Sequence, residues 1–170
     1  MGTQHLDFAE FYRSSRDQCL RTVLVVVGDQ DSAQEIVAEA FARAWASWRT
    51  VSRHPAPAAW VVRTALNVNV SRWRRHHREV PVPDPGALAD WPSAAQGSHD
   101  PVDPQVMAAL LRLPARQREV IALRLILDLD TGSTARVLGV RPNTVMTHMG
   151  RALETLRGDL DLALESQWEN

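Results

Sequence analysis

The sequence TGSTARVLGVRPNTVMTHMGRALETLR, residues 131–157, decides the fold of the C-terminal part of the chain. It contains two segments with helical spacing, joined by Gly139-Val140-Arg141. Gly139 permits a tight turn, and Pro142 suits the first position of a helix, where its missing N–H is not needed. Ala135 is small enough for two helices to approach closely. The spacing therefore predicts a helix-turn-helix, whose second helix has an inward stripe of Val145, Met149, Leu153 and Leu156.

The composition upstream of this motif divides the chain into two units. Six of the ten prolines fall between residues 79 and 104, together with four aspartates and no arginine. Such a composition cannot hold a helix or a central strand. We therefore predict an N-terminal domain at residues 1–80, a flexible acidic linker at residues 81–104 and a C-terminal domain at residues 105–170.

The N-terminal domain has the pattern of three helices. Apolar residues recur at helical spacing from Phe8 onward, and Gly28 supplies a stop. A second helix is predicted to start at Ser32, which would cap it while Glu35 reaches back, and to carry Trp45 on its buried face. The third helix covers residues 60–78. The predicted fold class is all-α: two small helical domains joined by a Pro/Asp-rich linker, the C-terminal one a helix-turn-helix.

The sequence lacks the features of several classes of protein. The longest uninterrupted apolar stretch, Val23–Val27, is too short to span a membrane, and the N-terminus has no secretory signal, so we expect a cytoplasmic protein. No Cys/His cluster has metal-ligand spacing, and no phosphate loop or nucleophile–base set is present. We therefore expect neither an enzyme nor a bound cofactor. The single Cys19 is expected to be a buried apolar residue.

The segment Arg72-Trp73-Arg74-Arg75-His76-His77-Arg78 combines positive charge with an aromatic ring. This combination suits nucleic-acid backbones and base stacking. It equally suits a helix end whose arginines favour the helix dipole while Trp73 fills the core, and the residues alone leave both interpretations open. Among the six tryptophans, Trp60 is the candidate for a base-stacking platform because it lies close to a proline-containing loop.

Four successive segments resemble a known family: DSAQEIVAEAFARAW (31–45), AAWVVRTALNVNVSRWRR (58–75), LPARQREVIALRL (113–125) and NTVMTHMGRALETLR (143–157). In this order, with the Pro/Asp linker in the middle, they resemble the extracytoplasmic-function (ECF) sigma factors of bacterial RNA polymerase, particularly the compact two-domain actinobacterial type. The resemblance implies a promoter-specificity subunit that binds core RNA polymerase, recognises the −35 and −10 elements of promoter DNA and captures flipped bases. An anti-sigma factor is a further partner that the family implies.

For the N-terminal domain, the resemblance implies two surfaces. The exposed face of the second helix, with Glu35, Glu39 and Arg43, would grip the clamp helices of polymerase; Ala38 stands where the family usually has Gln. The loop of residues 51–58 would accept a base flipped out of the −10 non-template strand, with Asn67 at the polar pocket position. The residues assigned to −10 DNA are Arg53, His54, Trp60, Arg63, Asn67, Ser71, Arg74, Arg75 and Arg78.

The predicted recognition helix departs from the family pattern. Met146 stands where the family usually has Lys or Arg, and Gly150 is expected to interrupt the helix. The residues assigned to −35 DNA are Arg141, Asn143, Thr144, Met146, Thr147, His148 and Arg151.

The net charge of −1 predicts weak binding to free duplex DNA and a need for polymerase as a partner. The acidic linker would either thread a basic polymerase channel, as in the family, or act as a tether. Two other functions stay open. One is a stand-alone regulator with a response-regulator-type output domain, because NTVMTHMGRALETL also resembles that family's recognition helix. The other is a helical interaction module that has lost DNA binding.

Overall fold

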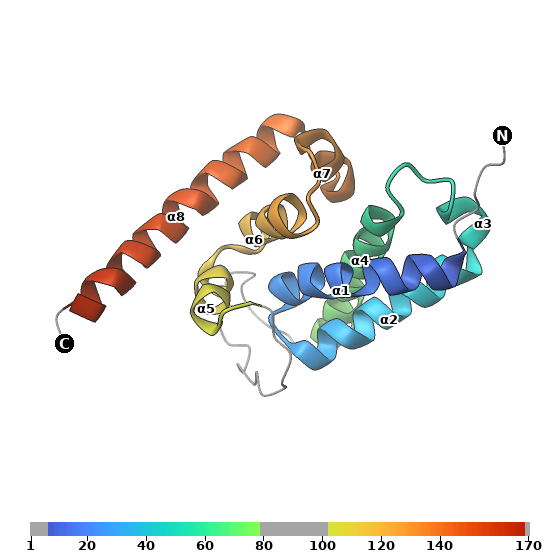
Figure 1. Ribbon diagram of the computed structural model, residues 1–170, viewed down its shortest axis with the longest axis horizontal. Coiled ribbons are helices and arrows are strands. Elements are labelled where there is room, and N and C mark those ends of the chain that lie inside the picture. The colour runs from blue at the N-terminus through green and yellow to red at the C-terminus, as the bar shows by residue number, and fades with distance from the viewer. Residues whose placement is uncertain (1–6, 79–101, 169–170) are drawn as a thin grey trace. The chain divides into compact units, whose positions relative to one another are not determined.

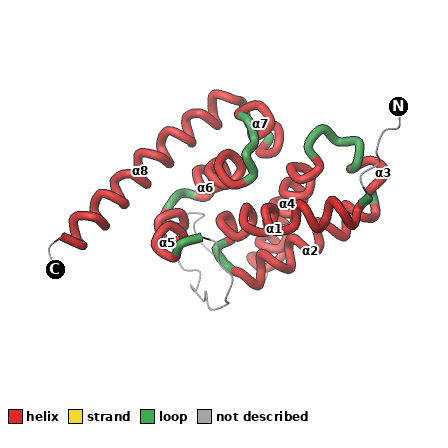
Figure 2. Tube along the Cα trace, in the orientation of Figure 1, coloured by secondary structure: helices red, strands yellow, loops and turns green. Residues whose placement is uncertain are grey.

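The computed structural model describes residues 7–78 and 102–168, with side chains described for residues 7–75 and 102–159. Over these residues the chain forms helices and loops and no strand, which confirms the all-α class (Figure 2). Residues 7–78 therefore do not form a βα-repeat receiver domain. The chain divides into two units, Met1–Gly97 and Ser98–Asn170. Most of the predicted linker lies outside the described residues.

The first unit contains helices α1 (Phe8–Val27), α2 (Gln30–Ala46), α3 (Trp48–Val51) and α4 (Pro57–Arg78). Helices α1, α2 and α4 pack against one another (Figure 1). Helix α1 ends as predicted at Gly28, whose φ of 80° is left-handed and whose N–H donates to the Leu24 carbonyl. The core is built from fully buried branched side chains: Val23, Val25, Ile36, Val61, Val62 and Val68. Cys19 is buried among them, as predicted.

The start of α2 differs from the sequence prediction. The helix begins at Gln30, and the carboxylate of Asp29 accepts a hydrogen bond of 2.8 Å from the Ser32 N–H. Ser32 is thus the third residue of the helix rather than its cap. Asp is as good a cap as Ser, and capping at Asp29 adds three helical residues. Glu35 consequently lies nearly a turn too far along the helix to reach back to the cap.

The second unit contains α5 (Pro104–Arg112), α6 (Ala115–Ile121), a π-helical turn η1 (Ala122–Ile126), α7 (Thr131–Leu138) and α8 (Pro142–Trp168). Asp103 caps α5, so the last residue of the predicted linker, Pro104, is already helical. Pro114, the residue before α6, separates α5 from α6.

Helices α7 and α8 form the predicted helix-turn-helix (Figure 1). Gly139 ends α7 with a φ of 65°, and Pro142 is the first residue of α8. A buried cluster of Val120, Ala135 and Val145 joins α6, α7 and α8, and Leu138, Val140 and Met149 pack against it. Ala135 therefore occupies the close approach that the sequence indicated.

Helix α8 runs without interruption from Pro142 to Trp168, so the prediction that Gly150 interrupts it is wrong. A glycine in a helix interior costs only about 1 kcal/mol relative to alanine. Val145 and Ala152, on either side of Gly150, are fully buried and hold both halves of the helix on the core. The free energy gained from this packing exceeds the cost of one glycine, so the helix continues through Gly150.

Candidate nucleic-acid interface

Helix α4 presents a polar and basic stripe to solvent. Arg63, Asn67, Ser71 and Arg74 are all exposed, and their spacing of four, four and three residues places them on one face of the helix. Trp60, three residues before Arg63, extends the stripe toward the start of α4 and is half-buried. Arg63 and Arg74 form no ion pair with any side chain that the structure describes. We refer to Trp60, Arg63, Asn67, Ser71 and Arg74 as the α4 stripe.

The α4 stripe lies in a part of the sequence that contains no acidic residue. Between positions 40 and 78 the chain has eight arginines and no acidic residue. Arg78 continues the stripe by its spacing, but its side chain lies outside those described. A helix face with exposed cations and no acids on its own element provides an electrostatic track for phosphates.

The loop before α4 places two more predicted residues beside the Trp60 end of the stripe. Arg53 and His54 are exposed in the segment between α3 and α4. The Ala56 N–H donates to His54 Nδ1 at 3.1 Å, so the imidazole accepts at this nitrogen and orients the chain as it enters the helix. The first backbone hydrogen bond of α4 follows directly, from the Trp60 N–H to the Ala56 carbonyl.

Two acidic residues of α2, Glu35 and Glu39, are tied to α4 by ion pairs. Arg72 donates to Glu35 at 2.9 Å and to Glu39 at 3.3 Å. Glu39 also accepts from Arg43 at 2.6 Å, and the two residues form an i,i+4 ion pair within α2. The three residues predicted to contact polymerase thus form a chain of charges that crosses from α2 to α4. Arg75, by contrast, donates to the carbonyl of Ser71 on its own helix.

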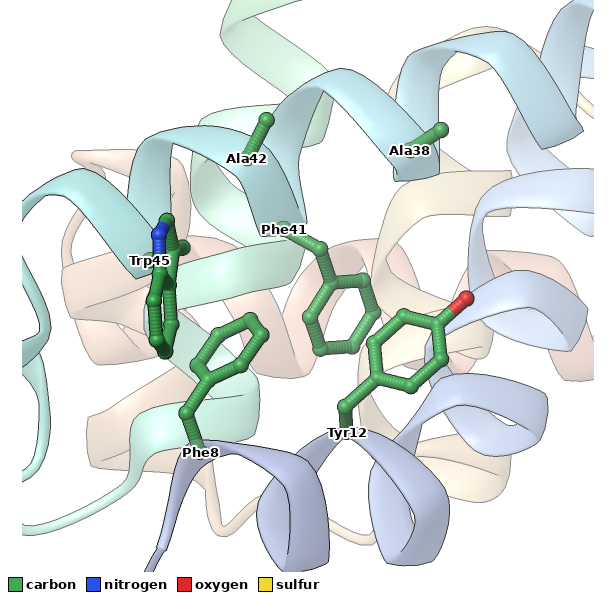
Figure 3. A pocket seen from close by; sticks show the side chains of 6 residues that line it. All are labelled: Phe8, Tyr12, Ala38, Phe41, Ala42 and Trp45. Carbon is green, nitrogen blue, oxygen red and sulfur yellow. The ribbon is translucent and has the colours of Figure 1, made fainter.

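A shallow apolar hollow, which the sequence analysis did not predict, lies between α1 and α2 and includes Ala38. It has a volume of about 300 Å³ and is lined by Phe8, Tyr12, Ala38, Phe41, Ala42 and Trp45. Phe8 and Tyr12 point from α1 toward α2, and Phe41 and Trp45 point from α2 toward them (Figure 3). The ring centroids of Phe8 and Trp45 are 4.9 Å apart.

Trp45 was predicted to be buried, but 63% of its surface is exposed. Its spacing from Ala38 and Ala42 could have indicated this, because residues at positions 38, 42 and 45 share one helix face that is distinct from the buried face. Trp48, one turn later, belongs instead to the separate helix α3 and stacks on Phe11 with centroids 5.1 Å apart.

The recognition helix α8 presents a different surface. Arg141, Asn143, Met146, Thr147 and Arg151 are exposed, whereas Thr144 and His148 are half-buried. His148 Nδ1 is buried and has no hydrogen-bond partner within the described residues. Thr147 donates its hydroxyl proton to the Asn143 carbonyl at 2.9 Å. Exposed positive charge on this helix therefore begins only at Arg151, in its third turn.

The structure offers little to covalent or metal chemistry. Burial raises the pKa of the Cys19 thiol to about 12, so it stays protonated at neutral pH. Within residues 7–75 and 102–159, no group of three or more His, Cys, Asp or Glu side chains is placed to hold a metal ion. Over the same described segments, no helix has the length and apolar character that crossing a lipid bilayer requires.

Comparison with known proteins gives a match for each of the two units. Residues 11–79 match the family model for sigma-70 region 2, and residues 104–156 match that for sigma-70 region 4. The RNA polymerase sigma-E factor of Streptomyces coelicolor is 31% identical over 156 residues, covering 91% of this chain and 86% of that protein. The RNA polymerase sigma factor SigV of Bacillus subtilis is 30% identical over 141 residues, covering 81% of each chain.

Among solved structures, the fold is similar to that of the sigma factor RpoE in a co-crystal structure with the anti-sigma factor NepR from Bartonella quintana. The TM-score is 0.77 at 22% identity, over 91% of this chain and 97% of that one.

Proposed function

Because the chain belongs to the ECF class of RNA polymerase sigma factors, we propose that its two units divide promoter recognition between them. Unit 1 binds core polymerase through α2 and reads the −10 element through α4 and the preceding loop. Unit 2 binds the −35 duplex through α8. The protein carries no reaction of its own in this account and acts in the cytoplasm, where bacterial polymerase works. The domain boundaries near residues 80 and 105 are part of the same proposal.

The α4 stripe is the observation that carries this proposal. A flipped base needs a hydrogen-bonding group for its edge, an aromatic or apolar surface for its face and cations for the adjoining phosphates. Asn67 supplies a donor and an acceptor on an exposed face, with Arg63 one turn before it and Arg74 two turns after it. Trp60 and the Arg53–His54 segment lie toward the start of the same helix.

The polymerase contact is proposed for the exposed face of α2, centred on the apolar hollow. Ala38, Ala42 and the exposed ring of Trp45 offer apolar area with few polar groups to desolvate. Glu35, Glu39 and Arg43 lie along one side of this face. Aromatic anchors surrounded by a polar rim are the usual composition of strong protein interfaces. An anti-sigma factor is a further proposed partner, on the grounds of family membership.

Run-off transcription on genomic fragments tests the proposed function. Core polymerase plus this protein is expected to give discrete transcripts whose start sites share upstream elements, and core polymerase alone is expected to give none. Start sites that share no upstream sequence would contradict promoter recognition. A stand-alone regulator would bind duplex DNA without polymerase, and an interaction module would bind none under either condition.

A further inference from the structure

The solvent-facing side of the first two turns of α8 is uncharged and partly apolar. Met146 is 64% exposed, which is the largest exposure of any large apolar side chain that the structure describes. Asn143 lies about one turn before it and Gly150 about one turn after it, on the same face. A Cβ added at Gly150 would meet no atom within 4 Å, so this part of the face is open. The thioether side chain of Met146 is therefore exposed to solvent.

The polar groups near Met146 are largely engaged or turned away. The hydroxyl proton of Thr147 is used by the helix itself, in the bond to the Asn143 carbonyl. His148 follows two residues after Met146, about 200° around the helix, and is half-buried. The middle of the recognition face thus offers a base edge an apolar, polarisable surface and no new hydrogen-bond donor except the Asn143 amide.

Thymine is the base that such a surface selects. In the major groove, its C5-methyl is the one apolar group that any base edge presents. Guanine offers two acceptors and cytosine a donor, and a methionine covering them would remove water without replacing its hydrogen bonds. Against a thymine methyl, the thioether instead buries apolar area on both sides.

We infer that Met146 is a specificity-determining residue that reads the C5-methyl of a thymine in the −35 duplex. The inference rests on the proposed −35 role of α8 and deepens it by naming the chemical group recognised. It also accounts for the absence of a cation at position 146, because an apolar contact is needed there. The non-specific attraction to phosphate is then provided by Arg141, Arg151 and polymerase.

Replacing single −35 thymines by deoxyuridine tests this inference, because the replacement removes the methyl and nothing else. The assay uses holoenzyme, made of core polymerase and this protein, on a mapped promoter, and it measures open-complex formation. At one or two positions, deoxyuridine is expected to weaken the wild-type complex about three- to fivefold, which corresponds to one buried methyl. Met146→Ala is expected to lower affinity for the thymine promoter and to make it insensitive to deoxyuridine at the same position.

Two further variants and one modified base sharpen the result. Met146→Leu keeps an apolar side chain and is expected to keep the preference for thymine, whereas Met146→Gln is expected to lose it. Val106→Ala, which truncates an exposed apolar residue on α5, is the matched control and should leave the deoxyuridine effect unchanged. Where cytosine replaces the thymine, 5-methylcytosine should recover part of the lost affinity.

The outcomes separate this inference from the proposed function. If wild-type holoenzyme depends on the −35 base pairs but tolerates deoxyuridine at every thymine, the Met146 inference is wrong and −35 recognition stands. An equal deoxyuridine effect in wild type and Met146→Ala would also overturn it, because another group would then read the methyl. If transcription is indifferent to the whole −35 sequence, both fail.

Discussion

The two helices proposed to meet DNA differ in what they expose. The α4 stripe offers arginines, an amide and a hydroxyl, and no acid lies between positions 40 and 78. The equivalent face of α8 offers a methionine, a threonine and a bare glycine before its first exposed cation on the helix, Arg151. The comparison indicates that charge and polarity are concentrated where single-stranded DNA would be held. On α8, where duplex DNA would be bound, recognition would instead depend on shape and apolar contact.

Removing charge from the α4 stripe is expected to have the largest effect. Arg63→Ala combined with Arg74→Ala removes two exposed cations that form no ion pair with any described side chain. Each substitution should therefore change the free energy of unfolding by less than about 0.5 kcal/mol. A charge-assisted hydrogen bond is worth about 1.5–3 kcal/mol, so open-complex stability should fall sharply. The slope of log affinity against log salt should fall by about 1.4. The same measurements on Arg13→Ala with Arg16→Ala, two exposed cations of α1, should match wild type. An equal loss of open-complex stability in the two double variants would show that the α4 stripe is not a specific DNA contact.

Asn67→Ala is expected to remove about 1–3 kcal/mol of discrimination at one −10 position. Asn67 is exposed, so the melting temperature should stay nearly unchanged, and a promoter already melted at that position should partly bypass the defect. Asn69→Ala is the matched control, because Asn69 is half-buried on another face of α4. Transcription from duplex and pre-melted templates carrying each base at that position provides the measurement. An unaltered base preference would exclude Asn67 from the pocket.

The surface of α2 allows polymerase binding to be separated from stability. Ala42→Arg places a charge in the hollow and is expected to weaken core polymerase binding at least about tenfold, or 1.4 kcal/mol, without unfolding unit 1. Glu39→Gln weakens the ion pairs that residue 39 makes with Arg43 and Arg72. Surface pairs of this kind contribute about 0–1 kcal/mol each, so the free energy of unfolding of unit 1 should fall only slightly. Titration of labelled core polymerase measures the binding affinity, and thermal melts measure the stability of each variant. Ala9→Arg, on exposed α1 surface outside the hollow, is the control. Normal binding by Ala42→Arg would move the contact elsewhere.

The smallest expected effect is that of Gly150→Ala, one of two glycine substitutions compared in the helix-turn-helix. Gly150→Ala should stabilise unit 2 by about 0.5–1 kcal/mol, because α8 is continuous there and the added methyl meets nothing. Gly139→Ala should destabilise it by about 1–2 kcal/mol, since its φ of 65° is costly for any residue with a Cβ. Chemical denaturation of the two variants gives the comparison. A destabilised Gly150→Ala would indicate that α8 bends at this residue.

Local signals were sufficient to predict most of the fold. Gly28, Gly139 and Pro142 end or begin helices through backbone geometry that belongs to the residue itself, and each acts as the sequence indicated. The cap of α2 was missed because Asp29 and Ser32 are both good caps and lie three residues apart. Nothing local decides between them. The π-helical turn at Ala122–Ile126 was also missed, within a segment whose apolar pattern reads as ordinary helix.

The candidate site was less predictable, because parts of it depend on tertiary packing. The spacing of the α4 stripe follows from helical periodicity and was visible in the sequence. The pairing of Arg72 with Glu35 joins residues 37 positions apart and requires α2 and α4 to be side by side. The exposure of Trp45 depends on how α1 covers α2, and Gly150 was judged by its propensity without the packing of Val145 and Ala152.

One measurement tests the central claim, that two differently built DNA surfaces work together only on polymerase. Binding of a labelled promoter fragment is followed with this protein alone, with core polymerase alone and with both, against a fragment of scrambled −35 and −10 sequence. We expect sequence-specific binding only with both proteins, because the chain has a net charge of −1 and little exposed cation on α8. Specific binding of the duplex promoter by the protein alone, at the affinity measured with polymerase, would contradict the account.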